Sequence, residues 1–569
     1  MRIFAFALII SSAFALWPFS KPPLTFYDAS TKSMLGSLSL EEKVGQVFIA
    51  PLAGKELSLE SKAFVRRSKL GNIILFSGIN DLRRRAETRA LTSNIFKIVM
   101  EEVRIPPFIG VDEEGGYVRH LHTTTHFPSA RAMGICNDEN LVRLAYKAMG
   151  LEARALGCNL LLSPVIDLHT NHGSTLLATR SFGEQPYKVA ALGKAALEGL
   201  YEARVISCLK HAPGHGATAI DTHIQAAPCT LSLSELETSH WIPFKQLAKH
   251  APAMMSSHVT YQAIDPSLPA TFSRDLLQIV LRARWNFTGL IISDSLTMEA
   301  LGEKSLGERA VQAFKAGCDC CLFGPIQSGK GPAHPSEAIG IIEEAMHYFI
   351  KAVESGEISL ERLDASVERI LKAKEQIPIA PPPPIDTAEH LALSQTIAEK
   401  SLTLLSSKEL FDSIDTSLFG KRIILLIPQT LESGLEKILS ALQFLLNVEE
   451  VDVHVIAAGE SLEIQEILNH ANEADLVFFL SRDISQFPAQ ATIAKALARA
   501  LPPEKLIFTG LSNPWEIAEL SLHKTHLVYL TYGKNPSSLI ALAKALGYHL
   551  LPPGELPLCE KISSCENGY

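Results

Sequence analysis

The sequence predicts two α/β domains in tandem, a (β/α)8 TIM-like barrel followed by a smaller αβα sandwich. Two observations predict the barrel. Short runs rich in Val, Ile, Leu and Phe recur with little polar alternation, as in strands buried on both faces of a parallel sheet. The segments between these runs are long enough for crossover helices. A third observation separates the domains, because the four prolines Pro381–Pro384 favour a stiff polyproline II linker.

Eight apolar runs precede the prolines, the number that a (β/α)8 barrel needs. A capping box at Ser39–Glu42 predicts a helix ahead of the first run. Ser359–Lys374 has the pattern of a closing amphipathic helix. The runs are Gly45–Ala50, Asn72–Phe76, Pro107–Val111, Asn159–Ile166, Val205–Leu209, Ala253–Ser256, Gly289–Ser293 and Cys318–Phe323.

We expect the barrel to occupy residues 30–375, a proline-rich linker 376–395 and the sandwich 396–569. A closed barrel needs no further sheet to complete its core, so the second domain is expected to be largely dispensable for the chemistry. Five apolar runs alternate with helical patterns in the sandwich: Arg422–Ile427, Val451–Ala457, Leu476–Leu480, Leu506–Thr509 and Leu527–Tyr532.

The N-terminus has the pattern of a secretory signal peptide over residues 1–15. Arg2 precedes an apolar run, and Ala13–Ala15 supplies a small-x-small cleavage site. A buried N-terminal helix is the alternative. The pattern predicts an exported protein, periplasmic or extracellular, with no integral membrane segment after signal removal. The net charge of −9 without a basic run argues against nucleic acid as a partner.

The nine cysteines do not indicate a metal site. Cys318, Cys320 and Cys321 lie in an apolar run with no His or second Cys pair nearby, so core packing is favoured over metal binding. Cys559 and Cys565 could pair in an oxidising compartment. We therefore expect neither a metal nor a cofactor, and the sequence does not indicate an oligomeric state.

Ionisable residues follow the predicted strands at the point where each strand ends. Active sites of (β/α)8 barrels lie at the carboxyl ends of the strands, so these side chains are expected to meet at one mouth. They are Asp112 after the third run, Asp167 after the fourth, Lys210 and His211 after the fifth, His258 after the sixth and Asp294 after the seventh.

A glycine-rich loop, Lys210–Gly216, leads to the sequence Asp221-Thr-His223. In an extended loop the side chains of Asp221 and His223 lie on one side, so the carboxylate can accept Nδ1–H and leave Nε2 to a substrate. Such a carboxylate raises the pKa of the imidazole, which suits a general acid/base near neutrality. An Asp-x-His pattern by itself more often indicates a surface ion pair. The position of this pattern in a loop after a barrel strand favours a catalytic role.

Asp294 is delivered by a strongly apolar run. A carboxylate there needs cationic or hydrogen-bonding neighbours to stay ionised, and Lys210 and Arg180 are candidates. An ionised carboxylate can attack the anomeric carbon of a sugar or stabilise an oxocarbenium ion. The alternative is an N-cap for a following helix, which is common in βα loops.

Two further loops carry polar groups. Asp112 begins a run of three acids and two glycines that could bind a divalent metal or sugar hydroxyls, and the lack of an acid–His pattern favours hydroxyls. Arg180 lies in a Gly-flanked loop, where it could donate a bidentate pair to substrate oxygens. A structural salt bridge of Arg180 with Asp167 or Asp112 is equally open.

Together these motifs resemble family 3 glycoside hydrolases of the two-domain type, in the β-N-acetylhexosaminidase branch. The Asp-x-His loop is the specific part, because glucosidase relatives generally lack it. The motifs occur in the expected order over about residues 38–371: DEEGG at Asp112–Gly116, RSFG at Arg180–Gly183, KHAPGHG with Asp221-Thr-His223, and SDSLTM at Ser293–Met298. The tail Gly554–Leu558 is also similar.

The resemblance implies a role for each of these side chains. It makes Asp294 the nucleophile and His223 the acid/base, with Asp221 orienting the imidazole, and it implies that Asp112, Arg180, Lys210 and His211 hold the sugar. Two positions depart from the family pattern. Ala212 stands where Phe is usual, and His120 stands where Arg is usual, with Arg119 one place early, so either of the latter two could contact substrate.

The implied activity is that of a retaining exo-β-N-acetylglucosaminidase in carbohydrate metabolism and peptidoglycan recycling. It would remove terminal N-acetylglucosamine from cell-wall glycan or muropeptide fragments through a covalent glycosyl-Asp intermediate. A phosphorylase with the same fold and residues is an alternative, because a neutral imidazole does not repel phosphate as a carboxylate does. A non-catalytic glycan-binding protein is the other, although binding alone needs no paired nucleophile and acid.

Overall fold

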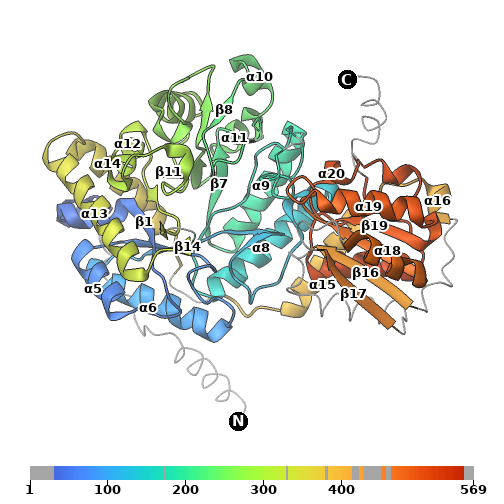
Figure 1. Ribbon diagram of the computed structural model, residues 1–569. Coiled ribbons are helices and arrows are strands. Elements are labelled where there is room, and N and C mark those ends of the chain that lie inside the picture. The colour runs from blue at the N-terminus through green and yellow to red at the C-terminus, as the bar shows by residue number, and fades with distance from the viewer. Residues whose placement is uncertain are drawn as a thin grey trace, which may run out of the picture.

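The computed structural model describes residues 31–171, 174–218, 220–328, 331–378, 382–412, 422–428, 450–456, 463–518 and 520–555. The predicted signal peptide, Pro381, Cys559, Cys565 and residues 556–558 of the tail motif lie outside these ranges. Figure 1 shows two bodies side by side, the first coloured blue to yellow and the second orange to red. No helix in the described part of the chain is long and apolar enough to cross a membrane.

The first body is a barrel of eight parallel strands, in the order β11-β9-β7-β6-β3-β2-β1-β12. A bridge between Ile292 and Cys320 brings the last strand back to β11, so the two ends of the sheet meet. The predicted (β/α)8 architecture is confirmed. The strands are β1 (Phe48–Pro51), β2 (Asn72–Leu75), β3 (Phe108–Val111), β6 (Leu160–Leu161), β7 (Ile206–Ala212), β9 (Ala253–Ser256), β11 (Leu290–Ser293) and β12 (Cys321–Leu322).

The first strand begins later than the sequence pattern indicates. Gly45 to Val47 continue the helix α4 (Leu40–Val47), which starts at the predicted capping box on Ser39. The helix packs so closely that a Cβ on Gly45 would lie 1.9 Å from the carbonyl oxygen of Lys69. The buried residues of the last helical turn and of the strand therefore form one continuous run in the sequence.

Helices surround the strands, and side chains fill the barrel interior. Ile49, Phe108 and Met255 belong to the interior cluster, which also includes Ile370. The three cysteines Cys318, Cys320 and Cys321 are fully buried among apolar residues. The covering elements include α5 (Leu59–Ser68), α6 (Arg85–Val103), α8 (Glu139–Ala155), α9 (Pro186–Glu202), α11 (Trp241–Leu247), a π-helical segment (Asp275–Arg284), α12 (Leu306–Ala316), α13 (Pro335–Glu354) and α14 (Leu360–Lys374).

The second body contains a six-stranded sheet in the order β15-β20-β19-β18-β16-β17, covered by helices. The five predicted runs form its parallel strands: β16 (Arg422–Pro428), β17 (Glu450–Ile456), β18 (Leu476–Ser481), β19 (Leu506–Gly510) and β20 (Leu527–Leu530). The antiparallel edge strand β15 (Thr403–Leu404) has only two residues and no sequence pattern of its own. The helices include α18 (Glu463–Glu473), α19 (Ala489–Ala500), α20 (Pro514–Ala518) and α21 (Pro536–Gly547).

The two bodies meet in a packed junction. The helix α15 (Thr387–Ser401) begins inside the range 376–395 and contacts α8, α21 and the barrel helix α7 (Ala130–Cys136). Ala132 and Ile135 of α7 belong to the same apolar cluster as residues of the second sheet. Apolar burial of this kind stabilises a domain interface, so the second body also covers part of the barrel surface.

A buried carboxylate joins α8 to α15 in this junction. Glu152 Oε1 lies 2.5 Å from His390 Nδ1, and the Glu152 carboxylate also accepts hydrogen bonds from the N–H and hydroxyl of Thr125. Burial acts to raise the pKa of Glu152, but the hydrogen bonds from His390 and Thr125 outweigh it and lower the pKa. A carboxyl with a lowered folded pKa stabilises the fold above its unfolded pKa, and this contribution is lost as the pH falls through the folded pKa.

We therefore expect Glu152→Gln to lower the free energy of unfolding by about 1–3 kcal/mol at pH 7, because a buried donor then lacks its acceptor. The deficit relative to wild type should shrink on acidification below about pH 4, where the wild-type carboxyl takes up its proton. Urea unfolding at several pH values measures both effects. The exposed Glu198→Gln on α9 is the matched control, and an equal loss in both variants would contradict the assignment.

Candidate active site

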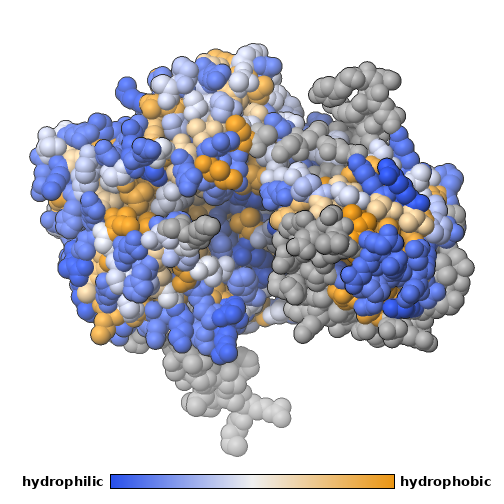
Figure 2. All heavy atoms as spheres, in the orientation of Figure 1, coloured by the Kyte–Doolittle hydropathy of each residue, from blue (hydrophilic) through white to orange (hydrophobic). Residues whose placement is uncertain are grey.

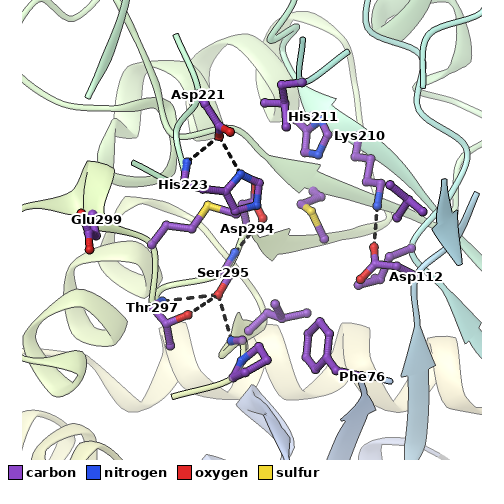
Figure 3. A pocket seen from close by; sticks show the side chains of 18 of the residues that line it. Phe76, Asp112, Lys210, His211, Asp221, His223, Asp294, Ser295, Thr297 and Glu299 are labelled. Carbon is purple, nitrogen blue, oxygen red and sulfur yellow. Dashed lines mark hydrogen bonds and ion pairs between the residues drawn. The ribbon is translucent and has the colours of Figure 1, made fainter. Parts of the chain in front are cut away.

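A cavity of about 1000 Å³ lies at the carboxyl ends of the barrel strands. Figure 2 shows a hollow lined by hydrophilic residues near the centre of the face, between the two bodies. All seven site residues predicted from the sequence line this cavity, and Figure 3 shows six of them from close by. They are Asp112, Arg180, Lys210, His211, Asp221, His223 and Asp294.

Asp294 follows β11, whose four residues are fully buried. Its side chain is 7% exposed, and Oδ1 accepts a 2.7 Å hydrogen bond from the Ser295 N–H. The helix N-cap alternative is wrong, because the next helical turn, Glu299–Leu301, is capped at Met298. Burial acts to raise the pKa of Asp294, but the nearby imidazoles and the Ser295 N–H outweigh it and lower the pKa to about 2. The carboxylate is therefore ionised and available to a ligand.

The groups that keep Asp294 ionised differ from the expected pair. We expected Lys210 and Arg180, but both bind Glu114. The neighbours with the largest effect on the Asp294 pKa are His211, His258 and His223. His258 is buried at the end of β9, where Nε2–H donates to the Ser295 carbonyl at 2.9 Å and Nδ1 contacts the Thr271 hydroxyl at 2.8 Å.

Glu114 is the centre of a buried ion cluster that the sequence did not reveal. Arg180 donates two hydrogen bonds of 2.9 Å to its carboxylate. Lys210 Nζ lies 2.6 Å from Glu114 and 2.6 Å from Asp112. Burial acts to raise the pKa of Glu114, but Arg180 and Lys210 outweigh it and lower the pKa to about 2. Among the described residues, the carboxylate that accepts hydrogen bonds from Arg180 is thus Glu114, and neither Asp167 nor Asp112.

The two-residue spacing between Asp112 and Glu114 could have predicted that Glu114 belongs to the site. Residues two apart in an extended backbone point to the same side, so both carboxylates turn toward Lys210. Sequence reasoning gave Glu114 no role separate from that of the other two acids, because the three acids of the motif are equivalent until their partners are known.

Asp167 fixes the direction of His211. It is fully buried and accepts hydrogen bonds from His211 Nδ1 at 2.7 Å, from the His211 N–H at 3.0 Å and from the His215 N–H at 2.6 Å. Burial acts to raise the pKa of Asp167, but His211 and His215 outweigh it and lower the pKa. Because Nδ1 of His211 is engaged, its Nε2 is the atom left for a ligand. Asp167 is therefore a positioning residue that stands behind the cavity wall.

Asp221 and His223 form the dyad predicted from their spacing. Asp221 Oδ1 accepts a hydrogen bond of 2.7 Å from Nδ1 and one of 2.9 Å from the backbone N–H of His223. The hydrogen bond to Asp221 raises the pKa of His223, against the opposing effect of burial. Figure 3 shows the imidazole between Asp221 and Asp294. An ionised carboxylate and a proton-holding imidazole thus share one cavity, as nucleophilic and acid–base catalysis require.

His120 and Arg119 have different surroundings. His120 lines the cavity, and its Nδ1 accepts a 3.4 Å hydrogen bond from the Ser77 N–H, so Nε2 carries the proton. Arg119 is absent from the residues that line the cavity in the described part of the chain. Its Nη2 donates to the carbonyls of Leu121 and Thr124.

The second body also contributes to the cavity wall. Arg482 and Gln486 from the loop after β18 line it, together with Asp483 and Ser512. The guanidinium of Arg482 lies 4.2 Å from the ring centroid of Tyr117, a barrel residue that immediately follows the DEEGG motif. Sequence reasoning missed these residues, because no local pattern shows that two loops so far apart in the chain meet.

Residues 39–373 match the glycosyl hydrolase family 3 N-terminal domain. A β-hexosaminidase of Tolumonas auensis is 35% identical over 277 residues, which cover 47% of this chain and 80% of that protein. A β-hexosaminidase of Pseudomonas aeruginosa is 33% identical over 296 residues, which cover 51% and 82%. A family 3 β-N-acetylglucosaminidase structure from Paenibacillus sp. str. FPU-7 has a TM-score of 0.80 at 30% identity, with 92% of this chain and 99% of that chain covered.

The fold and the cavity define a two-domain barrel enzyme whose mouth combines an ionised carboxylate with an imidazole–carboxylate dyad. The chain belongs to glycosyl hydrolase family 3, and it is a glycoside hydrolase. The resemblance drawn from the four motifs is thereby confirmed.

The different surroundings of His120 and Arg119 predict that removing His120 lowers activity, whereas removing Arg119 lowers stability. His120→Ala should lower kcat/KM about 2- to 10-fold, the worth of one hydrogen bond to the ligand, with little effect on unfolding. Arg119→Ala should lower the free energy of unfolding by about 1–3 kcal/mol, because the partly buried hydrogen bonds that its guanidinium donates to the carbonyls of Leu121 and Thr124 are lost. Kinetics and urea unfolding on both variants test this. Reversed losses would show that Arg119 is the ligand contact.

Proposed function

We propose that this protein is a retaining exo-β-N-acetylglucosaminidase, with Asp294 as nucleophile and His223 as acid/base. The observation that carries the proposal is the Asp221–His223 dyad beside an ionised Asp294 in one cavity. The sugar specificity is supported by the names of the similar proteins, β-hexosaminidase and β-N-acetylglucosaminidase.

The reaction has two steps. In the first, the Asp294 carboxylate attacks the anomeric carbon, and the imidazolium of His223 gives its Nε2 proton to the departing glycosidic oxygen. In the second, neutral His223 takes a proton from water, whose oxygen attacks the anomeric carbon and releases Asp294. Two displacements retain the anomeric configuration. Asp221 holds the imidazole in the tautomer that both steps need.

The remaining residues predicted from the sequence bind the sugar. Lys210 and His211 present donors, and Asp112 presents an acceptor, to hydroxyl and amide groups. Arg180 reaches the cavity while its guanidinium is held on Glu114. Because Glu114 and Asp167 fix these side chains in advance, the sugar meets groups that are already oriented.

We extend the proposal to peptidoglycan fragments as natural substrate and to a location outside the cytoplasm. The N-terminal segment supports this, since its sequence is typical of an export signal, although it lies outside the described residues. A cell-wall glycan is accessible to an exported enzyme.

One observation favours a second candidate, a phosphorylase. The acid/base beside Asp294 is an imidazole, which is neutral after the first step and does not repel phosphate. Turnover of an aryl N-acetylglucosaminide with and without phosphate separates the two activities. Release of free N-acetylglucosamine at a rate independent of phosphate supports the hydrolase, whereas formation of the sugar 1-phosphate supports the phosphorylase.

Replacement of the nucleophile is expected to abolish turnover. Asp294→Ala should lower kcat about a thousandfold or more, roughly 4 kcal/mol of barrier, because no covalent intermediate can form. A 2-fluoro or 5-fluoro sugar should label Asp294, as peptide mass spectrometry can show. The exposed Asp275→Asn is the control that should retain activity. A label on Asp112 or Glu299, which also line the cavity, would refute the assignment.

Loss of the acid/base is expected to depend on the leaving group. His223→Ala should slow a natural disaccharide about 10²–10⁴-fold, and an activated aryl glycoside far less on the first step, because only a basic oxygen needs the proton. In wild type, kcat/KM for a poor leaving group should fall as pH rises through the raised pKa of His223. Asp221→Asn should move this alkaline limb to lower pH, since the carboxylate raises that pKa.

Steady-state kinetics on the two substrates and a pH profile of kcat/KM provide the measurements. Equal slowing of both substrates by His223→Ala would assign the proton to another group. An alkaline limb that does not move in Asp221→Asn would remove the orienting role of Asp221.

A further inference from the structure

The loop that carries the dyad is exposed next to the acid/base. The side chain of His223 is 52% exposed, and residues 223–226 are all exposed. The backbone hydrogen bonds beside the dyad are internal to the loop, because the N–H groups of Ile224 and Gln225 donate to the Asp221 carbonyl. An acid/base must stay within hydrogen-bond reach of the departing oxygen, so a contact outside the loop is needed to fix it.

Thr222, the residue between Asp221 and His223, provides this contact. It is 1% exposed, and its hydroxyl lies 3.1 Å from Nε2 of His215, which is also 1% exposed. Burial is the main cause that lowers the pKa of His215 to about 4, so the ring is neutral near pH 7. A hydroxyl both donates and accepts, so either neutral tautomer can make this hydrogen bond. In the described part of the chain, no other side chain of residues 217–226 hydrogen-bonds to a residue outside the loop.

His215 is itself fixed to the barrel. Its backbone N–H donates to Asp167 at 2.6 Å, and its ring packs edge-on against the ring of His211 at a centroid distance of 5.9 Å. The carbonyl of the preceding residue, Gly214, accepts a 2.6 Å hydrogen bond from the Tyr261 hydroxyl. The imidazole is therefore a firm anchor behind the loop, held by the same carboxylate that orients His211.

We propose that the hydrogen bond between Thr222 and His215 holds the acid/base in place, which makes both of them positioning residues. The proposal rests on the proposed glycosidase function. Thr222 is joined through the backbone to Asp221 and His223, so a hydroxyl held by the barrel fixes the chain from which both dyad side chains extend. Asp221 sets the proton affinity of the imidazole, whereas Thr222 sets its location relative to the departing oxygen.

Thr222→Val tests this, because it removes the hydroxyl and keeps the branched shape of the side chain. The measured quantity is the ratio of kcat/KM for a β-linked N-acetylglucosamine disaccharide to kcat/KM for an activated aryl N-acetylglucosaminide. A displaced acid slows only the basic leaving group, so the ratio should fall about 3- to 10-fold, the worth of one hydrogen bond. Thr222→Ser keeps the hydroxyl, and its ratio should remain within twofold of wild type.

Two further measurements separate positioning from a merely structural role. The alkaline limb of the kcat/KM profile should not move in Thr222→Val, since Asp221 still raises the pKa of His223. Thr92→Val on α6 is the matched control, because the Thr92 hydroxyl is 2% exposed as a residue and donates to the Leu156 carbonyl at 2.7 Å. Its loss should lower stability and leave the ratio unchanged.

A second variant keeps the proposal falsifiable if Thr222→Val does not fold. His215→Phe removes the same hydrogen bond from the other side, so the ratio should fall to a similar extent, and Thr222→Val should add little in the double variant. A ratio within twofold of wild type in either folded variant, or equal falls in Thr222→Val and Thr222→Ser, would overturn the proposal. A shifted alkaline limb in Thr222→Val would also overturn it, because the hydroxyl would then act on the pKa of the imidazole.

The two proposals can fail separately. If wild type cleaves both glycosides but the variants do not change the ratio, the glycosidase assignment stands and the positioning role falls. If wild type cleaves neither glycoside, the glycosidase assignment falls, and amide hydrogen exchange of the peptide that contains residues 220–226 decides whether Thr222 anchors the loop. Exchange there should be about 3- to 10-fold faster in Thr222→Val than in Thr92→Val, and equal exchange would overturn the anchor.

Discussion

Charge buried at the strand ends is the constraint on which this active site depends. Lys210 and Glu114 are buried at the strand ends, with Arg180 largely covered beside them, and an unpaired charge there would cost several kcal/mol. The Glu114 carboxylate forms ion pairs with both Lys210 and Arg180, and the Lys210 ammonium also pairs with Asp112. The pairing that stabilises the buried ions also fixes their directions, so the fold and the ligand-binding geometry have the same physical cause.

The two reactive groups owe their different proton affinities to their nearest partners. Asp294 lies among imidazoles and accepts a backbone N–H, which favours the ionised carboxylate. His223 lies against a carboxylate of its own, which favours the imidazolium. One enclosed space can therefore hold a base that has lost its proton and an acid that has kept one, over a wider pH range than the free side chains allow in water.

The sequence predicted those features of the site that depend on the backbone geometry of a few neighbouring residues. The strand-end rule located Asp294, and the two-residue spacing of Asp221 and His223 gave their hydrogen bond, since both depend on local backbone geometry. The partner of Arg180 could not be chosen, because three carboxylates were available and only the folded barrel selects Glu114. The start of β1 was misplaced, because a buried helical turn and a buried strand cannot be told apart from a pattern of three residues.

The apolar contact between α7 and the second sheet has a consequence for biogenesis. Domains fold as units and in order as the chain is synthesised, so the barrel is complete while the strands that cover Ala132 and Ile135 are still to come. During that interval the nascent barrel presents an uncovered hydrophobic surface, which holdase chaperones recognise and which promotes self-association. Once it has folded, the second sheet covers this apolar surface and thereby protects the barrel from aggregation.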